Sequence, residues 1–282
     1  MSKSLKIALV GGGNMGGALA AGWLRTKRSK VDAENLVIVD PAPGDAVQDL
    51  IEQHKLTHLE TLSEETGADI DLVVLAVKPQ ILEQVAASLA PVLRADTAVI
   101  SIMAGITLNR LAMALGDRPI VRAMPNTAAA VGAGVSVCVS NVAGEAIEAT
   151  ATRLLKVAGA VEWVQDERLI GAVTAVSGSG PAYVFLLAEA LAGAGTAEGL
   201  PRELAEKLAR ETIVGAGALL AASGKSPQEL RRAVTSPGGT TQAAIDVLMG
   251  GGGGLPELVR QAVSAAERRS RQMGNGNGRG ER

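Results

Sequence analysis

Residues 234–241 carry the most informative chemistry in the sequence. They read Val-Thr-Ser-Pro-Gly-Gly-Thr-Thr, a flexible turn with hydroxyl side chains and no charge, histidine or cysteine. These side chains can form hydrogen bonds but cannot hold a metal or act as an acid–base pair. Gly238 and Gly239 tolerate the positive φ of a tight turn, and a helix that begins at Thr240 or Thr241 would aim backbone N–H groups at an anion. The same residues are equally typical of an ordinary turn between helices, so this stretch alone leaves both interpretations open.

A glycine-rich motif near the start of the chain predicts a dinucleotide site. Residues 11–16, Gly-Gly-Gly-Asn-Met-Gly, satisfy the pattern G-x-G-x-x-G and stand between an apolar run, residues 5–10, and a predicted helix over residues 15–26. This order of strand, glycine turn and helix places a dinucleotide pyrophosphate at the helix N-terminus. A glycine-rich turn without a ligand is the alternative. From this motif we expect cofactor contacts by Gly11, Gly13, Asn14, Met15 and Gly16.

Asp40 bears on which nicotinamide cofactor is used. It ends the next predicted strand, at the position of the acid that binds the adenosine ribose. A carboxylate there accepts hydrogen bonds from the ribose diol and repels a 2′-phosphate, whereas sites that prefer NADP usually supply an arginine nearby. No arginine or lysine follows Asp40 before Lys55. We expect NADPH or NADH as cofactor, with NADH accepted well.

Two further predicted strands end in polar residues, within Ala-Val-Lys-Pro-Gln at 76–80 and Met-Pro-Asn-Thr at 124–127. The carboxyl ends of parallel strands form the edge at which open α/β sheets bind ligands. Lys78 is alternatively a solvated charge after a strand, whereas Asn126 could donate to a carboxamide or to a substrate oxygen. To the expected cofactor site these strand ends add Ala76, Val77, Lys78, Pro79 and Asn126.

The elements that must position these residues fall into two halves. In the first half, short β-branched runs alternate with helical stretches, which predicts βαβ units and a parallel sheet. The strands are predicted at residues 6–10, 36–40, 72–76, 98–102, 120–123 and 135–139. From about Glu145 the strands are expected to vanish, and helices are predicted over residues 145–158, 169–195, 201–223, 227–234, 240–248 and 255–271.

The predicted fold class is therefore α/β, with an N-terminal Rossmann-like dinucleotide-binding domain followed by an all-α domain. We place the NAD(P)-binding domain at residues 1–164 and the helical domain at 165–273. Residues 274–282 consist of glycine, asparagine and charged residues and are predicted to be a disordered tail.

Composition excludes several classes of function. The formal net charge of −2 gives no basis for nucleic-acid binding. The single cysteine, Cys138, cannot form an internal disulfide and lies between valines, which indicates an inert buried thiol in a reducing compartment. The histidines, His54 and His58, fall in a polar stretch, so hydrolase chemistry has no evident base. No cluster has metal-ligand spacing, and we expect no metal.

The sequence also gives no sign of secretion or of a membrane span. The start of the chain runs directly from an apolar strand into the glycine turn, without the pattern of a signal peptide. Residues 170–191 come closest to a span, but Gly, Ser and Pro punctuate them and Glu189 interrupts them. We expect a cytoplasmic protein that binds neither membrane nor nucleic acid.

Four motifs, in this order along the chain, resemble the pyrroline-5-carboxylate reductase family: residues 11–16, 76–80, Gly-Ser-Gly-Pro-Ala-Tyr at 178–183, and 234–241. The resemblance spans residues 7 to about 249. It implies hydride transfer from NADPH or NADH to the cyclic imine 1-pyrroline-5-carboxylate, which gives L-proline. Departures from the family pattern are Ala128 in place of proline, Arg231-Arg232 in place of Lys-Asp or similar, and a longer glycine run at 250–254.

The resemblance also implies the roles of site residues. The substrate carboxylate would lie in the 234–241 turn, and the Thr241 hydroxyl would face the ring nitrogen, with Thr241 and Ser236 as the catalytic residues. The implied substrate-binding residues are Ser236, Gly238, Gly239, Thr240, Thr241, Ser179 and Gly180. Helical domains of two subunits interlock in this family, which implies a homodimer; higher assemblies of dimers are possible, and the sequence does not decide whether they form.

Two alternatives remain at this stage. One is a related imine reductase or another two-domain NAD(P)-dependent oxidoreductase, such as a β-hydroxyacid dehydrogenase. The hydroxyacid enzymes would carry a catalytic lysine in the long interdomain helix, and no lysine occurs between Ala158 and Glu206. The other alternative is a dimer that binds the cofactor without turnover.

Overall fold

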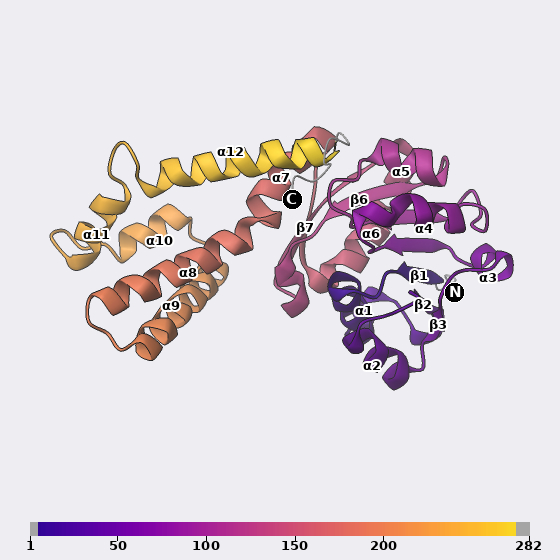
Figure 1. The fold of residues 1–282 in the computed structure, drawn as a ribbon, viewed down its shortest axis with the longest axis horizontal. Helices are drawn as coiled ribbons and strands as arrows, with labels where there is room; N and C mark the ends of the chain where they lie inside the picture. Colours follow the sequence, from indigo (N-terminus) through magenta and orange to yellow (C-terminus); the bar gives the residue numbers. More distant parts are fainter. Residues whose placement is uncertain (1–4, 275–282) are drawn as a thin grey trace. The chain divides into compact units, whose positions relative to one another are not determined.

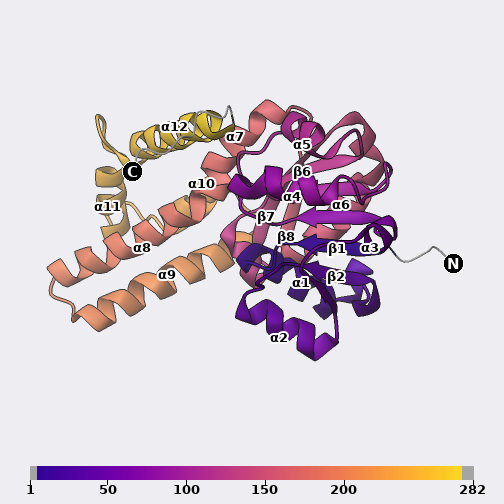
Figure 2. The ribbon, with the colours of Figure 1, turned by 45° about the vertical axis from the view of Figure 1, so that its right-hand side comes forward.

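The computed structural model describes residues 5–274, which form two compact units (Figures 1 and 2). Of the described residues, the first unit holds 5–178 and 267–274, and the second holds Ser179–Ala266. This spatial grouping divides the chain at Gly178, whereas the division proposed from the sequence follows the change of pattern near Val164. The proposed tail lies outside the described residues except for Gly274, which ends a helix.

An eight-stranded sheet forms the centre of the first unit, in the order β3-β2-β1-β4-β5-β6-β7-β8. The strands are β1 (Ile7–Val10), β2 (Leu36–Val39), β3 (Thr57–Leu59), β4 (Leu72–Leu75), β5 (Ala98–Ser101), β6 (Ile120–Met124), β7 (Gly134–Ser140) and β8 (Gly159–Trp163). All neighbouring strands pair in parallel except β6 and β7, which are antiparallel. The order of the first six strands is that of a dinucleotide-binding Rossmann sheet, which confirms the predicted fold class.

Helices cover both faces of this sheet. They are α1 (Asn14–Arg25), α2 (Asp45–His54), α3 (Glu64–Ala68), α4 (Leu82–Leu89), α5 (Leu108–Leu115), α6 (Glu148–Leu155) and α7 (Ile170–Val173). Alternate strand residues point to opposite faces, so Ile7 and Leu9 pack with α1 and α6, while Ala8 and Val10 pack with α4 and α5. Burial on both faces explains the continuous apolar strands seen in the sequence.

Two edge strands contradict the sequence interpretation. Strand β3 was not expected, because Thr57 and His58 are polar and exposed. Strand β8 lies beyond residue 145, where strands were expected to vanish, and it extends the sheet beside β7. An edge strand packs on fewer neighbours, so its residues alternate between exposed and half-buried instead of forming an apolar run. The helix predicted over residues 145–158 is α6 flanked by 3₁₀ turns.

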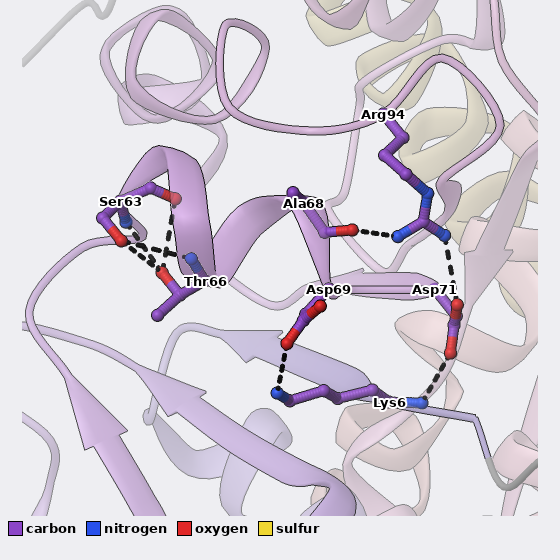
Figure 3. A network of polar contacts seen from close by, with 7 residues as sticks. All are labelled: Lys6, Ser63, Thr66, Ala68, Asp69, Asp71 and Arg94. Carbon is purple, nitrogen blue, oxygen red and sulfur yellow. Dashed lines mark hydrogen bonds and ion pairs between the residues drawn. The ribbon is translucent and has the colours of Figure 1, made fainter.

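A polar network anchors the strands at the edge where β1 and β4 begin (Figure 3). The Asp71 carboxylate accepts from the Lys6 backbone N–H at 3.0 Å and pairs with Arg94 at 3.1 Å. Asp69 pairs with the Lys6 ammonium at 3.3 Å. The Ser63 hydroxyl caps α3 by accepting from the Thr66 backbone N–H at 3.2 Å. This edge is opposite to the carboxyl ends of the strands, so we assign the network to structure.

The second unit consists of helices alone. They are α8 (Gly180–Ala197), α9 (Arg202–Ser223), α10 (Pro227–Ala233), α11 (Thr240–Leu248) and the first part of α12 (Leu255–Gly274). Helices α8 and α9 lie side by side as a hairpin (Figures 1 and 2). Among the described residues of this unit only Ala205 and Ala209 are buried, whereas Phe185 is 68% exposed. The unit therefore has no apolar core of its own and must be covered by another surface.

The helix predicted over residues 169–195 is interrupted. It comprises α7, a π-helical turn at Thr174–Gly178, and α8. The whole helical run Glu167–Ala197 is long and apolar enough to cross a membrane by length and composition alone, and it is the one such run among residues 5–274. The sequence analysis argued against a membrane span here, because Gly, Ser, Pro and Glu189 interrupt the apolar run. Exposed apolar side chains are equally typical of a helix that is covered by another protein surface.

Candidate active site

Two glycines in the turn between β1 and α1 lie so close to other backbone atoms that no side chain fits there. Gly11 has a φ of +106°, and a Cβ atom there would lie 2.7 Å from the carbonyl carbon and oxygen of Ala76. A Cβ atom on Gly16 would overlap the carbonyl oxygen of Gly11. Both positions therefore require glycine. The absence of side chains lets the turn pack closely against the backbone at the end of β4.

Gly13 differs from its neighbours because its surroundings are open. No described atom lies within 4 Å of where its Cβ would be. Gly13 is also the N-cap of α1, with extended backbone, and no described side chain caps that helix. The first N–H groups of α1 therefore face open space beside a glycine with no side chain. A dinucleotide pyrophosphate fits this arrangement, because the helix dipole and the N–H groups stabilise negative charge.

The Asp40 carboxylate connects the glycine turn to the loop after β2. Its Oδ2 accepts from the Gly12 N–H at 2.5 Å and its Oδ1 accepts from the Ala42 N–H at 2.8 Å. An ionised carboxylate has about four lone-pair directions, so each oxygen can still accept from a ribose hydroxyl. The exposed His58 ring lies beside this loop, with Nε2 at 2.8 Å from the Asp40 carbonyl oxygen. The residues present thus fit the ribose end of a nicotinamide dinucleotide.

The residues that follow β4 pack against the glycine turn. The Ala76 N–H donates to the Val10 carbonyl at 2.8 Å, and the Val77 side chain would be 3.0 Å from a Cβ on Gly11. Lys78 is exposed and precedes a 3₁₀ turn that begins at Pro79. The structure thus brings Ala76 and Val77 to the glycine turn. Contacts of Lys78 and Pro79 with a cofactor stay predictions.

Asn126 has a different environment from the one expected. It follows β6, and its side-chain amide donates to the Ser177 carbonyl at 3.1 Å, while its Oδ1 accepts from the Val135 N–H at 3.3 Å. Both ends of the amide are therefore engaged within the protein. A contact between Asn126 and the cofactor stays a prediction.

In the second unit, residues 236–239 form a tight turn that leads into α11. The Gly239 N–H donates to the Ser236 carbonyl at 3.1 Å, with Pro237 second in the turn and Gly238 third at a φ of +70°. These features define a type II turn. A Cβ on Gly239 would lie 2.7 Å from the Ser236 hydroxyl. The sequence predicted that Thr240 or Thr241 begins the next helix, and α11 begins at Thr240.

The N-terminus of α11, which follows this turn, offers backbone N–H donors and carries no charged side chain. Gly239 is its N-cap, and no described side chain caps the helix. The Thr240 hydroxyl is exposed and Thr241 is half-buried. A shallow hollow of about 230 Å³ lies beside the turn and is lined by Arg231, Arg232, Thr235, Gln242 and Ile245. The two arginines place positive charge close to the uncharged turn.

A larger cleft, of about 540 Å³, belongs to the first unit and shares no lining residue with the predicted site. Within it, Glu167 Oε1 accepts from Arg122 at 2.6 Å and from the Leu108 N–H at 2.8 Å. Arg168 pairs with Asp166 at 2.8 Å. Because these charges are paired, we assign the cleft to structure.

The cysteine offers no alternative nucleophilic site. Cys138 is fully buried, and burial, with a smaller effect of the Glu148 charge, raises the pKa of its thiol to about 12. Such a thiol is a poor nucleophile. Within residues 5–274 no group of three or more His, Cys, Asp or Glu side chains could hold a metal ion.

The Rossmann sheet, the open glycine turn and the separate helical unit define the class of NAD(P)-binding proteins with two domains. Residues 6–105 match the family model "NADP oxidoreductase coenzyme F420-dependent", and residues 167–273 match "Pyrroline-5-carboxylate reductase dimerisation". The dimerisation match accounts for the exposed apolar helices of the second unit.

Comparison with known proteins names the family. The chain is 40% identical to a pyrroline-5-carboxylate reductase of Pseudomonas aeruginosa, over 95% of this chain and 96% of that one. A Synechocystis relative of the same name is also 40% identical, over 96% and 99% of the two chains. The chain belongs to the pyrroline-5-carboxylate reductase family.

Solved structures agree. The pyrroline-5-carboxylate reductase of Coxiella burnetii superposes with a TM-score of 0.87 at 34% identity, covering 96% of this chain and 99% of that one. The Plasmodium falciparum enzyme, solved with NADP bound, superposes with a TM-score of 0.78 at 31% identity, covering 96% and 98%.

Proposed function

We propose that this protein reduces 1-pyrroline-5-carboxylate to L-proline with hydride from NADPH or NADH. The observation that carries the proposal is that a chain of this family contains both a glycine turn with open surroundings at Gly13 and an uncharged, hydroxyl-bearing turn before α11. A lysine, which a hydroxyacid dehydrogenase would need in its long helix, is absent between Ala158 and Glu206.

The chemistry suits a site without strong acids or bases. A protonated cyclic imine is already electrophilic, so the protein's main task is to position it and to hold its carboxylate. The reduced nicotinamide, when bound, supplies a hydride to the carbon of the C=N bond. The π electrons of that bond pass to nitrogen, which keeps its proton and becomes the secondary amine of proline.

We assign the substrate carboxylate to the turn before α11. The Ser236 hydroxyl, the flexible Gly238–Gly239 backbone and the uncapped N–H groups at Thr240 and Thr241 are donors for an anion at a helix N-terminus. The Thr241 hydroxyl is proposed to hydrogen-bond the iminium nitrogen or to help supply its proton. Ser179 and Gly180 complete the proposed substrate contacts.

For the cofactor, we propose the contacts expected from the sequence and good acceptance of NADH. Asp40 binds the ribose diol and repels a 2′-phosphate, and residues 41–54 contain no arginine or lysine. The cofactor contacts are assigned to Gly11, Gly13, Asn14, Met15, Gly16, Asp40, Ala76, Val77, Lys78 and Pro79; Asn126 is left out, because its side-chain amide already bonds to the Ser177 carbonyl and the Val135 N–H.

The active form is a homodimer, because the second unit matches the family's dimerisation model and exposes its apolar side chains. We propose that each site combines the turn of one subunit with the cofactor of the other. A cytoplasmic location and the lack of membrane and nucleic-acid partners are also proposed, together with the domain division at residue 164.

A pair of threonine variants tests the proposed chemistry. Thr241→Ala should lower kcat for 1-pyrroline-5-carboxylate at least tenfold, the loss of one hydrogen bond of about 1.4 kcal/mol in the transition state. Thr196→Ala is the matched control, since that exposed hydroxyl only donates to the Ala192 carbonyl of its own helix. Unchanged turnover by Thr241→Ala would remove the role assigned to this hydroxyl.

A further inference from the structure

The junction between the π-helical turn and α8 contains a carbonyl that lacks its ordinary helical donor. The carbonyl of a helical residue accepts from the N–H four residues later in an α-helix and five residues later in a π-helix, which for Ser177 means residue 181 or Ala182. Residue 181 is proline and has no N–H, so it cannot donate to the carbonyl of Ser177. The Ala182 N–H donates to the Ser179 carbonyl at 3.0 Å.

Asn126 supplies the missing donor from another part of the chain. Its Nδ2 lies 3.1 Å from the Ser177 carbonyl oxygen, across 51 positions in sequence. Its Oδ1 accepts from the Val135 N–H at 3.3 Å, so one side-chain amide joins β7 to the π-helical turn. An amide can do this because it donates and accepts at once.

The π-helical turn is held by side chains along its length. The Thr174 hydroxyl donates to the Ile170 carbonyl at 2.7 Å, and the Ser177 hydroxyl donates to the Val173 carbonyl at 2.9 Å. A Cβ on Gly178 would lie 3.0 Å from the Met124 methyl group, so β6 also packs closely here. π-helical turns of this kind are frequent at functional sites, and Ser179 and Gly180 follow directly in the chain.

We propose that Asn126 is a positioning residue. Its side-chain amide replaces the N–H that Pro181 lacks, and so holds the π-helical turn in the conformation that presents Ser179 and Gly180 to the substrate. This rests on the proposed function in so far as those two residues belong to the substrate site. It differs from the expectation that Asn126 contacts the cofactor.

A double-mutant cycle between positions 126 and 181 tests the bridge, because Pro181→Ala restores a main-chain N–H at the position whose α-helical acceptor is the Ser177 carbonyl. Asn126→Ala should lower the melting temperature by about 2–4 °C in the wild-type background and by less than half as much in the Pro181→Ala background. Equal losses in both backgrounds would overturn the bridge. Asn126→Asp, which keeps the acceptor for Val135 and loses the donor, takes its place if Asn126→Ala does not fold.

The same four proteins test the positioning role. In the wild-type background Asn126→Ala should lower kcat/KM for 1-pyrroline-5-carboxylate about tenfold, with the Kd for NADPH and NADH changed less than twofold; with Pro181→Ala the loss should shrink to threefold or less. A tenfold weaker cofactor Kd would instead make Asn126 a cofactor ligand. Unchanged kcat/KM, with a coupled loss of stability, would make the bridge merely structural. If the wild-type protein reduces no 1-pyrroline-5-carboxylate, the proposed function fails, and the melting cycle alone judges the bridge.

Discussion

Gly13→Ala separates cofactor binding from folding at the glycine turn. No described atom lies within 4 Å of the new Cβ, and the φ of Gly13 is −80°, which alanine adopts without strain. Losing glycine restricts the unfolded chain, which stabilises by about 0.4–1 kcal/mol, while alanine is a poorer N-cap than glycine by a similar or smaller amount. The free energy of unfolding should therefore change by less than about 1 kcal/mol.

The cofactor should respond much more strongly. If a pyrophosphate oxygen lies where the substitution adds its methyl group, at least one charge-assisted hydrogen bond is lost, worth about 1.5–3 kcal/mol. The Kd for NADPH or NADH should rise roughly 10- to 150-fold.

Fluorescence titration of the reduced cofactor, with urea unfolding in parallel, measures both quantities. Two further variants complete the comparison. Gly253→Ala, also in open space and without positive φ, should change neither. Gly16→Ala should cost about 1–3 kcal/mol of stability, because its methyl overlaps the Gly11 carbonyl. Unchanged cofactor affinity in Gly13→Ala would refute the placement of the pyrophosphate at this turn.

Three further predictions concern the cofactor ribose, the dimer and the buried thiol. Asp40→Ser should raise the ratio of kcat/KM with NADPH to that with NADH about tenfold, since removing the carboxylate relieves its repulsion of the 2′-phosphate; an unchanged ratio would mean that the ribose is recognised elsewhere. Phe185→Asp places a charge on an apolar face of α8 and should destabilise the dimer by roughly 2 kcal/mol or more, measured by light scattering. Met113→Asp, which changes an exposed residue of the first unit, should leave the dimer intact. A fully dimeric Phe185→Asp protein would argue against an interface at this face. The pKa of Cys138 is raised from 9.0 to about 12 in the folded protein, so its contribution to stability is complete below pH 9 and is lost as the pH rises towards 12. At pH 8 a thiol reagent should label Cys138 only in urea, and rapid labelling of the folded protein would contradict its burial.

Local patterns were sufficient to predict most of the first unit. The strands β1, β2, β4 and β5 are buried on both faces, and two-sided burial demands the apolar runs that the sequence displays. The edge strands β3 and β8 escaped prediction, because their side chains face water in part and carry no such run.

The sites show the same division between local and non-local information. The glycine turn and the start of α11 depend on neighbouring residues, and both were predicted. The bond between Asn126 and Ser177 joins residues far apart in sequence. A proline at position 181 removes one helical N–H donor, but only the fold shows that the Asn126 side chain bonds to the Ser177 carbonyl.

The most direct test of the central claim is the loss of reduced-nicotinamide absorbance when the purified dimer meets 1-pyrroline-5-carboxylate, run with NADH and NADPH in parallel and with proline measured as product. We predict oxidation with at least one cofactor, one proline formed for each nicotinamide oxidised, and good rates with NADH. A folded dimer that oxidises neither cofactor, or that oxidises one without forming proline, would contradict the proposed function.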